Sequence, residues 1–171
     1  MLLTPHPEFP PSGVSSIDVN AWRDGDRWHF RYLLEGAGML VLPKSKERIR
    51  ADDLWRTSCF EAFVGDGGHS YREFNFAPSG QWAAYAFEAP RSGMKESEAE
   101  VEVWLEGGET WIALEAAVSA DLTPQSPLGL TAVIEEEGGV KSYWALSHAK
   151  GPPDFHHPDC FTARLPSVSA E

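Results

Sequence analysis

The segment PDFHHPDC at residues 153–160 concentrates side chains that can bind metals or transfer protons. These are Asp154, His156, His157, Asp159 and Cys160. Such side chains are common zinc ligands and common general acids and bases. Adjacent residues of an extended chain point to opposite sides, so His156 and His157 cannot readily hold one ion. Pro158 and the aspartates are typical of turns. We therefore expect a polar loop that closes the fold and can border a site, and no metal.

Segment 52–87 carries a second group of polar residues, set among aromatic ones. Strand alternation places Glu61 on one face of a first strand and Glu73 on one face of a second. If Glu61 lies beside Glu73, the two carboxylates repel unless a cation or a ligand hydroxyl lies between them. If Glu61 lies beside Arg72, the two form an ordinary cross-strand pair. The sequence leaves both registers open.

Apolar residues recur with a period of two along most of the chain, which predicts strands. Strands are expected at 27–35, 54–64, 70–77, 81–88, 101–106, 111–118 and 160–165, and the one helical candidate is a short turn within 42–54. Many short strands separated by glycine-rich turns predict an all-β fold, an antiparallel β-sandwich of jelly-roll or immunoglobulin type. The expected organisation is an irregular, proline-rich arm at 1–13, a single domain at 14–166 and a flexible tail at 167–171.

The composition narrows the expected partners. A net charge of −12 repels nucleic acid phosphates and anionic lipid, so neither nucleic acid nor membrane partners are expected. No apolar run approaches the ~20 residues of a membrane helix. The first residues lack the basic start and apolar stretch of a secretory signal. The two cysteines have no metal-type spacing, so we expect a cytoplasmic protein with free thiols.

Three stretches carry a resemblance to a known family. They are LWRTSCFEAFV, then YREFNFAPSGQWAAYAF with Arg91 and Met94 after it, and then YWALSHAKGPPDFHHPDCFTARL. Across about residues 14–165 the chain resembles the bacterial DOMON-like proteins, which are related to the family nine carbohydrate-binding modules and to the DOMON heme- or sugar-binding domains. The resemblance implies a sandwich of two antiparallel sheets, with a ligand site on one concave face or at its rim. It also implies that tryptophans and polar side chains hold a saccharide, often with structural calcium nearby.

The resemblance and the residue types together select a candidate site. Its expected members are Trp55, Glu61, Asn75, Trp82, Arg91, Trp144, His148 and His156. Exposed aromatic rings beside polar groups suit the apolar face of a sugar ring. Glu61, Asn75 and Arg91 would orient the ligand through hydrogen bonds. We therefore expect a non-enzymatic domain that binds a small carbohydrate or carbohydrate-like molecule.

Two alternatives remain open. The first is a hydrolase that uses a carboxylate or histidine of the same surface, although no nucleophile elbow, zinc-protease motif, phosphate-binding loop or dinucleotide fingerprint occurs. The second is a heme or metal binder. Heme would need a methionine and a histidine, drawn from Met39, Met94, His29, His69 and His148. A metal held by the loop at 153–160 would need a distant third ligand.

Overall fold

The computed structural model describes residues 1–44 and 46–167. The chain is built from short strands joined by turns and short 3-10 helices. The strands are β1 (Leu2–Pro5), β2 (Ser16–Asp24), β3 (Arg27–Glu35), β4 (Cys59–Gly65), β5 (Tyr71–Phe76), β6 (Trp82–Phe87), β7 (Lys95–Glu96), β8 (Glu100–Gly107), β9 (Trp111–Ser119), β10 (Pro127–Glu136), β11 (Val140–Ala145) and β12 (Ala163–Arg164). The 3-10 helices are η1 (Ala37–Met39), η2 (Leu54–Arg56) and η3 (Pro158–Cys160). The expectation of an all-β chain is confirmed.

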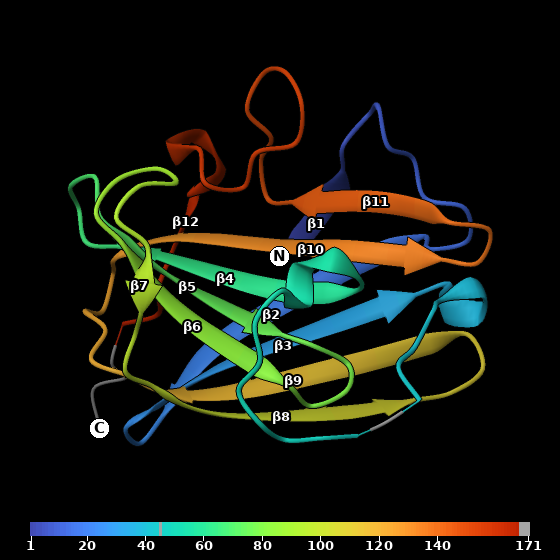
Figure 1. Ribbon diagram of the computed structural model, residues 1–171, viewed down its shortest axis with the longest axis horizontal. Coiled ribbons are helices and arrows are strands. Elements are labelled where there is room, and N and C mark those ends of the chain that lie inside the picture. Colours follow the sequence, from blue (N-terminus) through green and yellow to red (C-terminus); the bar gives the residue numbers. More distant parts are fainter. Residues whose placement is uncertain (45, 168–171) are drawn as a thin grey trace.

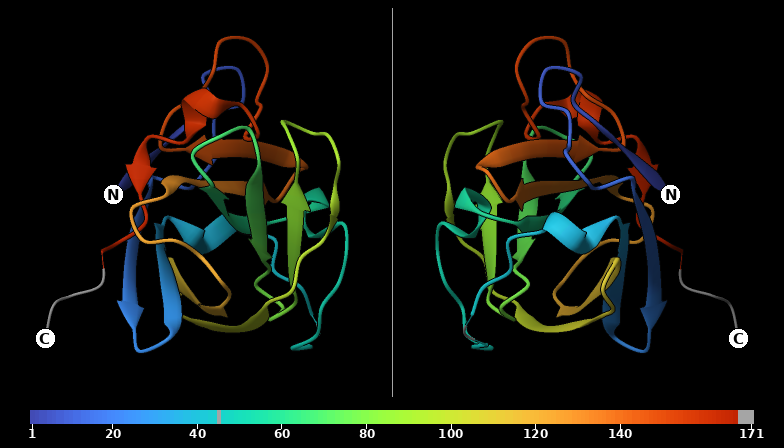
Figure 2. Two further views of the ribbon diagram at one scale, coloured as in Figure 1. Left: turned by 90° about the vertical axis from the view of Figure 1, so that its left-hand side faces the viewer. Right: turned by 90° about the vertical axis from the view of Figure 1, so that its right-hand side faces the viewer.

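The strands form one antiparallel sheet in the order β7-β6-β5-β4-β10-β11-β1-β2-β3-β9-β8, with β12 paired to β10. The sheet curls, so that the part ending at β11 faces the part beginning at β2 (Figures 1 and 2). Strand β1 joins the two parts, because Leu2 and Leu3 pair with β2 whereas Thr4 and Pro5 pair with β11. The expected sandwich of two separate sheets therefore needs correction to one curled sheet with two facing halves.

The main core fills the space between the two halves. Phe30 of β3 stacks on Phe76 of β5 with ring centroids 6.0 Å apart, and Tyr32 of β3 packs on Phe60 of β4 at 5.1 Å. All four rings are fully buried. The predicted period of two explains this packing, since alternate residues of each strand face inward. The residues between them face away from this core and are free to build a second surface.

The N-terminal arm is more ordered than the sequence predicts. Leu2–Pro5 is a strand, and Leu3 is buried at 4 % exposure. Beyond the strand, the buried carboxylate of Glu136 accepts hydrogen bonds from the amides of Ser12 and Gly13 at 2.7 and 2.5 Å. A carboxylate that accepts amide hydrogens fixes a segment that has no strand partner. The expectation of an irregular arm at 1–13 is therefore wrong for residues 2–5.

Two expected strands are shorter than predicted. Strand β4 begins at Cys59 rather than at 54, because Leu54–Arg56 turns as η2. The last strand shrinks from 160–165 to Ala163–Arg164, because Pro158 opens η3 and the side chain of His157 caps it. Within the expected tail, residues 168–171 lie outside the described part of the chain.

Candidate ligand-binding site

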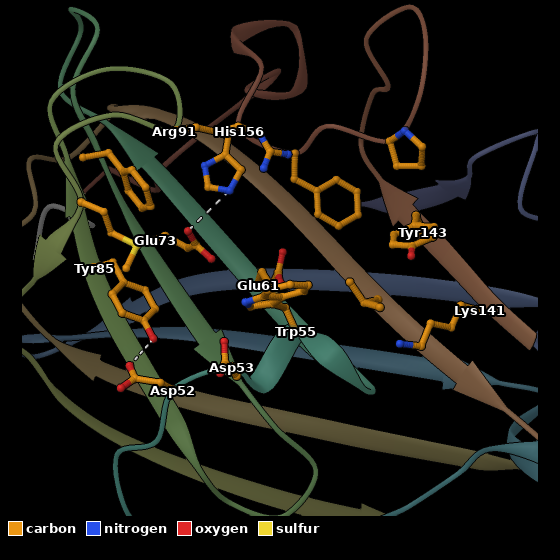
Figure 3. A pocket seen from close by; sticks show the side chains of 15 residues that line it. Asp52, Asp53, Trp55, Glu61, Glu73, Tyr85, Arg91, Lys141, Tyr143 and His156 are labelled. Atoms are coloured by element: carbon orange, nitrogen blue, oxygen red, sulfur yellow. Dashed lines mark hydrogen bonds and ion pairs between the residues drawn. The ribbon is translucent and has the colours of Figure 1, made fainter. Parts of the chain in front are cut away.

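The outer face of the half formed by β6, β5, β4, β10 and β11 carries a cavity of about 490 Å³ (Figure 3). Its floor takes one side chain from each of these strands, namely Tyr85, Glu73, Glu61, Val133 and Tyr143. These residues alternate along their strands with the core residues, so one set of strands serves both surfaces. The volume lies in the range of small-molecule sites.

Three chain segments and one further side chain form the wall. The wall residues are Asp52, Asp53 and Trp55 around η2, Phe87 at the end of β6 with Arg91 and Met94 after it, Pro153, Phe155 and His156 from the loop before η3, and Lys141 of β11. Trp55 is 49 % exposed at this rim. Because Leu54–Arg56 turns as η2 and does not continue into strand β4, the large ring of Trp55 faces solvent at the rim. The Arg56 guanidinium lies 5.0 Å from the centroid of the Trp55 ring.

Two buried carboxyl groups dominate the floor. Glu61 is 3 % exposed and Glu73 is 6 % exposed. Glu61 accepts a hydrogen bond of 2.9 Å from the hydroxyl of Thr131. Burial, reinforced by the charge of Glu73, raises the pKa of Glu61 to about 8. Burial raises the pKa of Glu73 to about 7, although the amide of Asn75 and the charge of Arg91 oppose that rise. The two groups therefore keep at least one proton between them at neutral pH.

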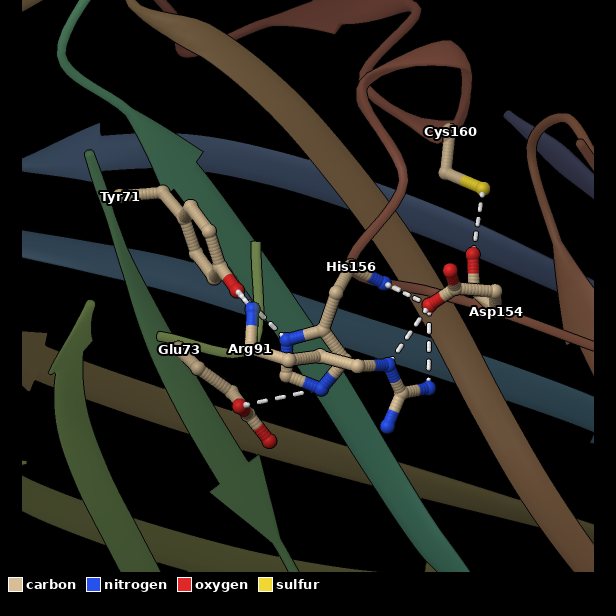
Figure 4. A network of polar contacts seen from close by, with 6 residues as sticks. All are labelled: Tyr71, Glu73, Arg91, Asp154, His156 and Cys160. Carbon is tan, nitrogen blue, oxygen red and sulfur yellow. Dashed lines mark hydrogen bonds and ion pairs between the residues drawn. The ribbon is translucent and has the colours of Figure 1, made fainter. Parts of the chain in front are cut away.

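A chain of hydrogen bonds fixes the orientation of His156 (Figure 4). The backbone amide of Arg91 donates to the hydroxyl of Tyr71 at 3.1 Å, and this hydroxyl lies 2.6 Å from Nδ1 of His156. Burial, followed by the charge of Arg91, lowers the pKa of His156 to about 4, so the ring is neutral at pH 7. Nδ1 then accepts from Tyr71, and Nε2 carries the hydrogen. Nε2 lies 3.8 Å from the carboxylate of Glu73, beyond hydrogen-bonding distance.

The wall holds two further polar pairs. Arg91 donates through Nε and Nη2 to Asp154 at 3.2 and 3.0 Å, and the same carboxylate oxygen accepts from the backbone amide of His156. Across the cavity, the hydroxyl of Tyr85 donates to Asp52 at 2.5 Å. This hydrogen bond, together with one from Arg50, lowers the pKa of Asp52. The guanidinium of Arg91 and the carboxylate of Asp52 are thus both engaged within the protein.

The sequence-predicted site residues fall into two groups. Trp55, Glu61, Arg91 and His156 line the cavity. Asn75 lies beside it, opposite Glu61 in the β4–β5 ladder and 1 % exposed.

Three predicted members do not line this cavity. Trp144 is in the main core, and its indole donates to Ser142. Trp82 packs against the same core, because it pairs with inward-facing Phe76. His148 lies behind the cavity wall, its Nε2 2.8 Å from the carbonyl of Thr4.

The site also contains residues that the sequence-based selection omitted. They are Asp52, Asp53, Glu73, Tyr85, Phe87, Met94, Val133, Lys141, Tyr143, Pro153 and Phe155. Strand parity could have found Glu73, which alternates with inward-facing Phe74. Parity could not choose between Tyr143 and Trp144, because both are large aromatic residues with a polar atom. The ladder decides, since Trp144 pairs with Ala132 of the core and Tyr143 with Val133 of the cavity floor.

Metal and heme binding depend on which side chains the fold brings together. Among the described residues, no group of three or more histidine, cysteine, aspartate or glutamate side chains is placed to hold a metal ion. The described residues therefore show no side-chain cluster of that kind for the structural calcium that the family resemblance implies. For heme, Met94 lines the cavity but His29, His69 and His148 do not.

Within residues 1–44 and 46–167, no helix is long and apolar enough to span a membrane.

Comparison with known proteins bears on the fold. No family model matches the chain, and no curated protein matches it. A solved structure from Bacteroides uniformis, provisionally assigned as a carbohydrate-binding protein, superposes with a TM-score of 0.61. The match covers 93 % of this chain and 83 % of that chain, at 15 % sequence identity. At this identity the likeness shows a shared fold.

Proposed function

We propose that the chain binds a small carbohydrate or carbohydrate-like molecule in the cavity on the outer face of β6, β5, β4, β10 and β11, without converting it. One observation carries this proposal: buried hydrogen-bonding groups converge on a small-molecule cavity that has a half-exposed tryptophan at its rim. Glu61, Glu73 and the Nε2–H of His156 offer acceptors and a donor for hydroxyl groups. Trp55 offers a face for the apolar side of a sugar ring.

The finer assignments belong to the same proposal. The fold shared with the Bacteroides uniformis protein supports a carbohydrate ligand. The motifs from Leu54 to Phe87 and from Tyr143 to Leu165 support membership of the DOMON-like proteins. We also propose that the protein acts in the cytoplasm, with Cys59 and Cys160 as the free, buried thiols that the structure contains. Fractionation of cells that produce the full-length protein tests this location.

Calorimetric titration tests the binding function. The probes are neutral monosaccharides and disaccharides, and the variants are Glu61→Gln and Trp55→Ala. We expect saturable binding that each variant weakens about tenfold, equivalent to ~1.4 kcal/mol. Trp104→Ala is the matched control, because Trp104 is a partly exposed ring on β8 in the other half of the sheet. Loss of binding in Trp104→Ala but not in Trp55→Ala would place the site elsewhere, and a panel without any binder would refute the proposal.

A hydrolase is the second candidate, favoured by the raised pKa values of Glu61 and Glu73. At neutral pH such a pair can present one protonated and one ionised carboxyl, as glycoside hydrolysis requires. Aryl glycosides that release a coloured phenol test for it. Turnover that disappears in both Glu61→Gln and Glu73→Gln would make the protein an enzyme. Binding without turnover would leave it a binding domain.

A further inference from the structure

Within the described residues, the two buried carboxyl groups have no cationic hydrogen-bond partner. Glu61 receives its hydrogen bond from a neutral hydroxyl, that of Thr131. Glu73 faces His156 across 3.8 Å, and that ring is neutral at pH 7. Carboxylates at 3 % and 6 % exposure are ordinarily paired with a cation, because an isolated buried charge is costly. A cationic group supplied by a ligand would therefore provide the missing partner of these two carboxyls.

The cations nearest to the cavity are engaged elsewhere. The guanidinium of Arg91 binds Asp154. The ammonium of Lys141 donates to the carbonyl of Arg56 at 2.5 Å. Arg72 has the opposite strand parity to Glu73, and its guanidinium donates to the carbonyls of Asp121 and Glu98. Arg72 on β5, the strand next to Glu61, therefore cannot act as the cationic partner of Glu61.

Asn75 is an independent sign of a missing ligand. Its side chain has the same strand parity as Glu73 and lies opposite Glu61, so it projects from the cavity face of the sheet. It is 1 % exposed and close enough to Glu73 to lower the pKa of that carboxyl, yet neither its amide nitrogen nor its amide oxygen makes a hydrogen bond of acceptable geometry within the described residues. Buried amides are rarely left unpaired, and each such case needs an explanation. A polar ligand group between the two carboxyls would supply the partner.

We propose that the ligand carries a protonated amino group and that this cation sits between Glu61 and Glu73, with the amide of Asn75 hydrogen-bonded beside it. The proposal rests on the function proposed above and narrows the ligand to an amino sugar or a similar polyhydroxylated amine. An organic cation fits better than a metal ion, because the described residues offer no group of three metal-binding side chains. Asp52 and Asp53 on the wall add negative potential that attracts a cation.

Binding of a cation should release a proton. The ionised forms of Glu61 and Glu73 bind an ammonium group, whereas the protonated forms do not. As long as the amino group of the ligand keeps its own proton, affinity should therefore rise as the pH rises toward about 7 to 8, where these two carboxyl groups ionise. The other titratable groups that line the cavity are Asp52, Asp53, Tyr85, Arg91, Lys141, Tyr143 and His156. His156 and Asp52 do not interfere in this range, because their pKa values are lowered.

The test uses sugars that differ at one position. Glucosamine, N-acetylglucosamine and glucose, with the corresponding galacto and manno compounds, are titrated into the full chain by calorimetry at pH 5.5 and pH 7, where the amino groups are mostly protonated. We expect the amine of at least one series to bind about tenfold more tightly than its parent sugar at the higher pH. Titration in two buffers of different ionisation enthalpy should show proton release with the amine and none with the parent sugar.

Variants separate this inference from the function on which it rests. Glu61→Gln and Glu73→Gln should each abolish the preference for the amine, so that the amine and its parent sugar bind with equal affinity. Trp55→Ala should weaken both sugars equally, and Glu102→Gln, an exposed carboxylate paired with Arg27 on the other half, should change nothing. Binding of parent sugar and amine with equal affinity would refute the amine and leave the carbohydrate proposal standing. A preference that survives in both glutamine variants would also refute it. If no compound binds, both proposals fail.

Discussion

Glu61 and Glu73 lie on neighbouring strands as diagonal neighbours: Glu61 is opposite Asn75, and Glu73 is opposite Phe63. Both carboxyls therefore project from the cavity face. Arg72, which the sequence offered as an alternative partner, pairs with Val64 and projects from the other face. This register excludes the ordinary cross-strand ion pair. It leaves two acidic groups buried together, and their protonation then links the stability of the protein to pH.

The first prediction concerns that linkage. The folded-state pKa values of Glu61 and Glu73 lie above the ordinary value of 4.5, so the native state holds protons that the unfolded chain releases. Their stabilising effect is complete below that ordinary value and is lost as the pH rises through about 7 to 8. We expect the free energy of unfolding to fall by several kcal/mol between pH 5 and pH 9, since one pKa unit corresponds to ~1.4 kcal/mol. Urea denaturation at several pH values measures it.

Glu61→Gln provides the comparison. The glutamine keeps the size of the side chain and can still bond to Thr131, but it cannot ionise. Its stability should therefore fall less steeply with pH than that of the wild type. Glu102→Gln removes a carboxylate that is half-exposed and should reproduce the wild-type slope. Equal slopes for wild type and Glu61→Gln would show that the carboxyl titrates normally.

The second prediction concerns the tautomer of His156. Because Tyr71 donates to Nδ1, nitrogen NMR should show an unprotonated Nδ1 and a protonated Nε2 from pH 8 down to about pH 5. The pKa of His156 is lowered from 6.5, so its contribution to stability is present above pH 6.5 and is lost as the pH falls toward about 4. Tyr71→Phe should lower the free energy of unfolding by roughly 1–3 kcal/mol, because it leaves Nδ1 of His156 without a donor and the amide of Arg91 without an acceptor.

Tyr143→Phe is the matched control, since it removes a tyrosine hydroxyl from the same cavity. It should change stability by less than ~0.5 kcal/mol. A native His156 that carries hydrogens on both ring nitrogens at pH 6, or that carries its single hydrogen on Nδ1, would contradict the proposed hydrogen-bond chain.

The third prediction concerns strand β1. Leu3 is 4 % exposed and packs in the main core, whereas Leu2 is 64 % exposed. Leu3→Ala should therefore destabilise the protein by roughly 2–4 kcal/mol, and Leu2→Ala should have almost no effect. Thermal and urea unfolding of the two variants measure the difference. Similar stabilities for both would mean that residues 2–5 are an irregular arm, as the sequence alone suggested.

The sequence predicts several of the long strands well, because alternation and turn residues act locally, but β2 and β10 are not among the expected strands. The strands expected at 27–35 and 111–118 match Arg27–Glu35 and Trp111–Ser119 almost residue for residue. Strand β1 escapes this reasoning because its four residues lie among prolines and gain their order from β2 and β11. Closure of the sheet is a property of that distant pairing, which no local pattern encodes.

The site is predicted in part for the same reason. Parity places Glu61 on the polar face of its strand, and turn residues identify the loop that carries His156. Register and loop path are not local properties. They decide that Trp144 enters the core and that Arg91, which has a left-handed backbone with φ of 57°, reaches Asp154. The charge environment of the two carboxyls follows from these tertiary contacts.

The last prediction concerns Asp154, which pairs with the wall residue Arg91 and whose replacement should alter the charge around Glu73. Asp154→Asn removes the charge that neutralises Arg91 but keeps an oxygen that can accept from the amide of His156. The positive charge of Arg91 already lowers the pKa of Glu73, so without its partner it should lower that pKa below about 7. NMR titration of the Glu73 carboxyl measures this shift. The protein would then supply its own cation, and the preference for an amine over its parent sugar should fall roughly three- to tenfold. Asp159→Asn, an exposed carboxylate of the same loop that faces His157, is the control and should leave both quantities unchanged. A wild-type pKa for Glu73 in Asp154→Asn would mean that Arg91 does not act on the carboxyl pair.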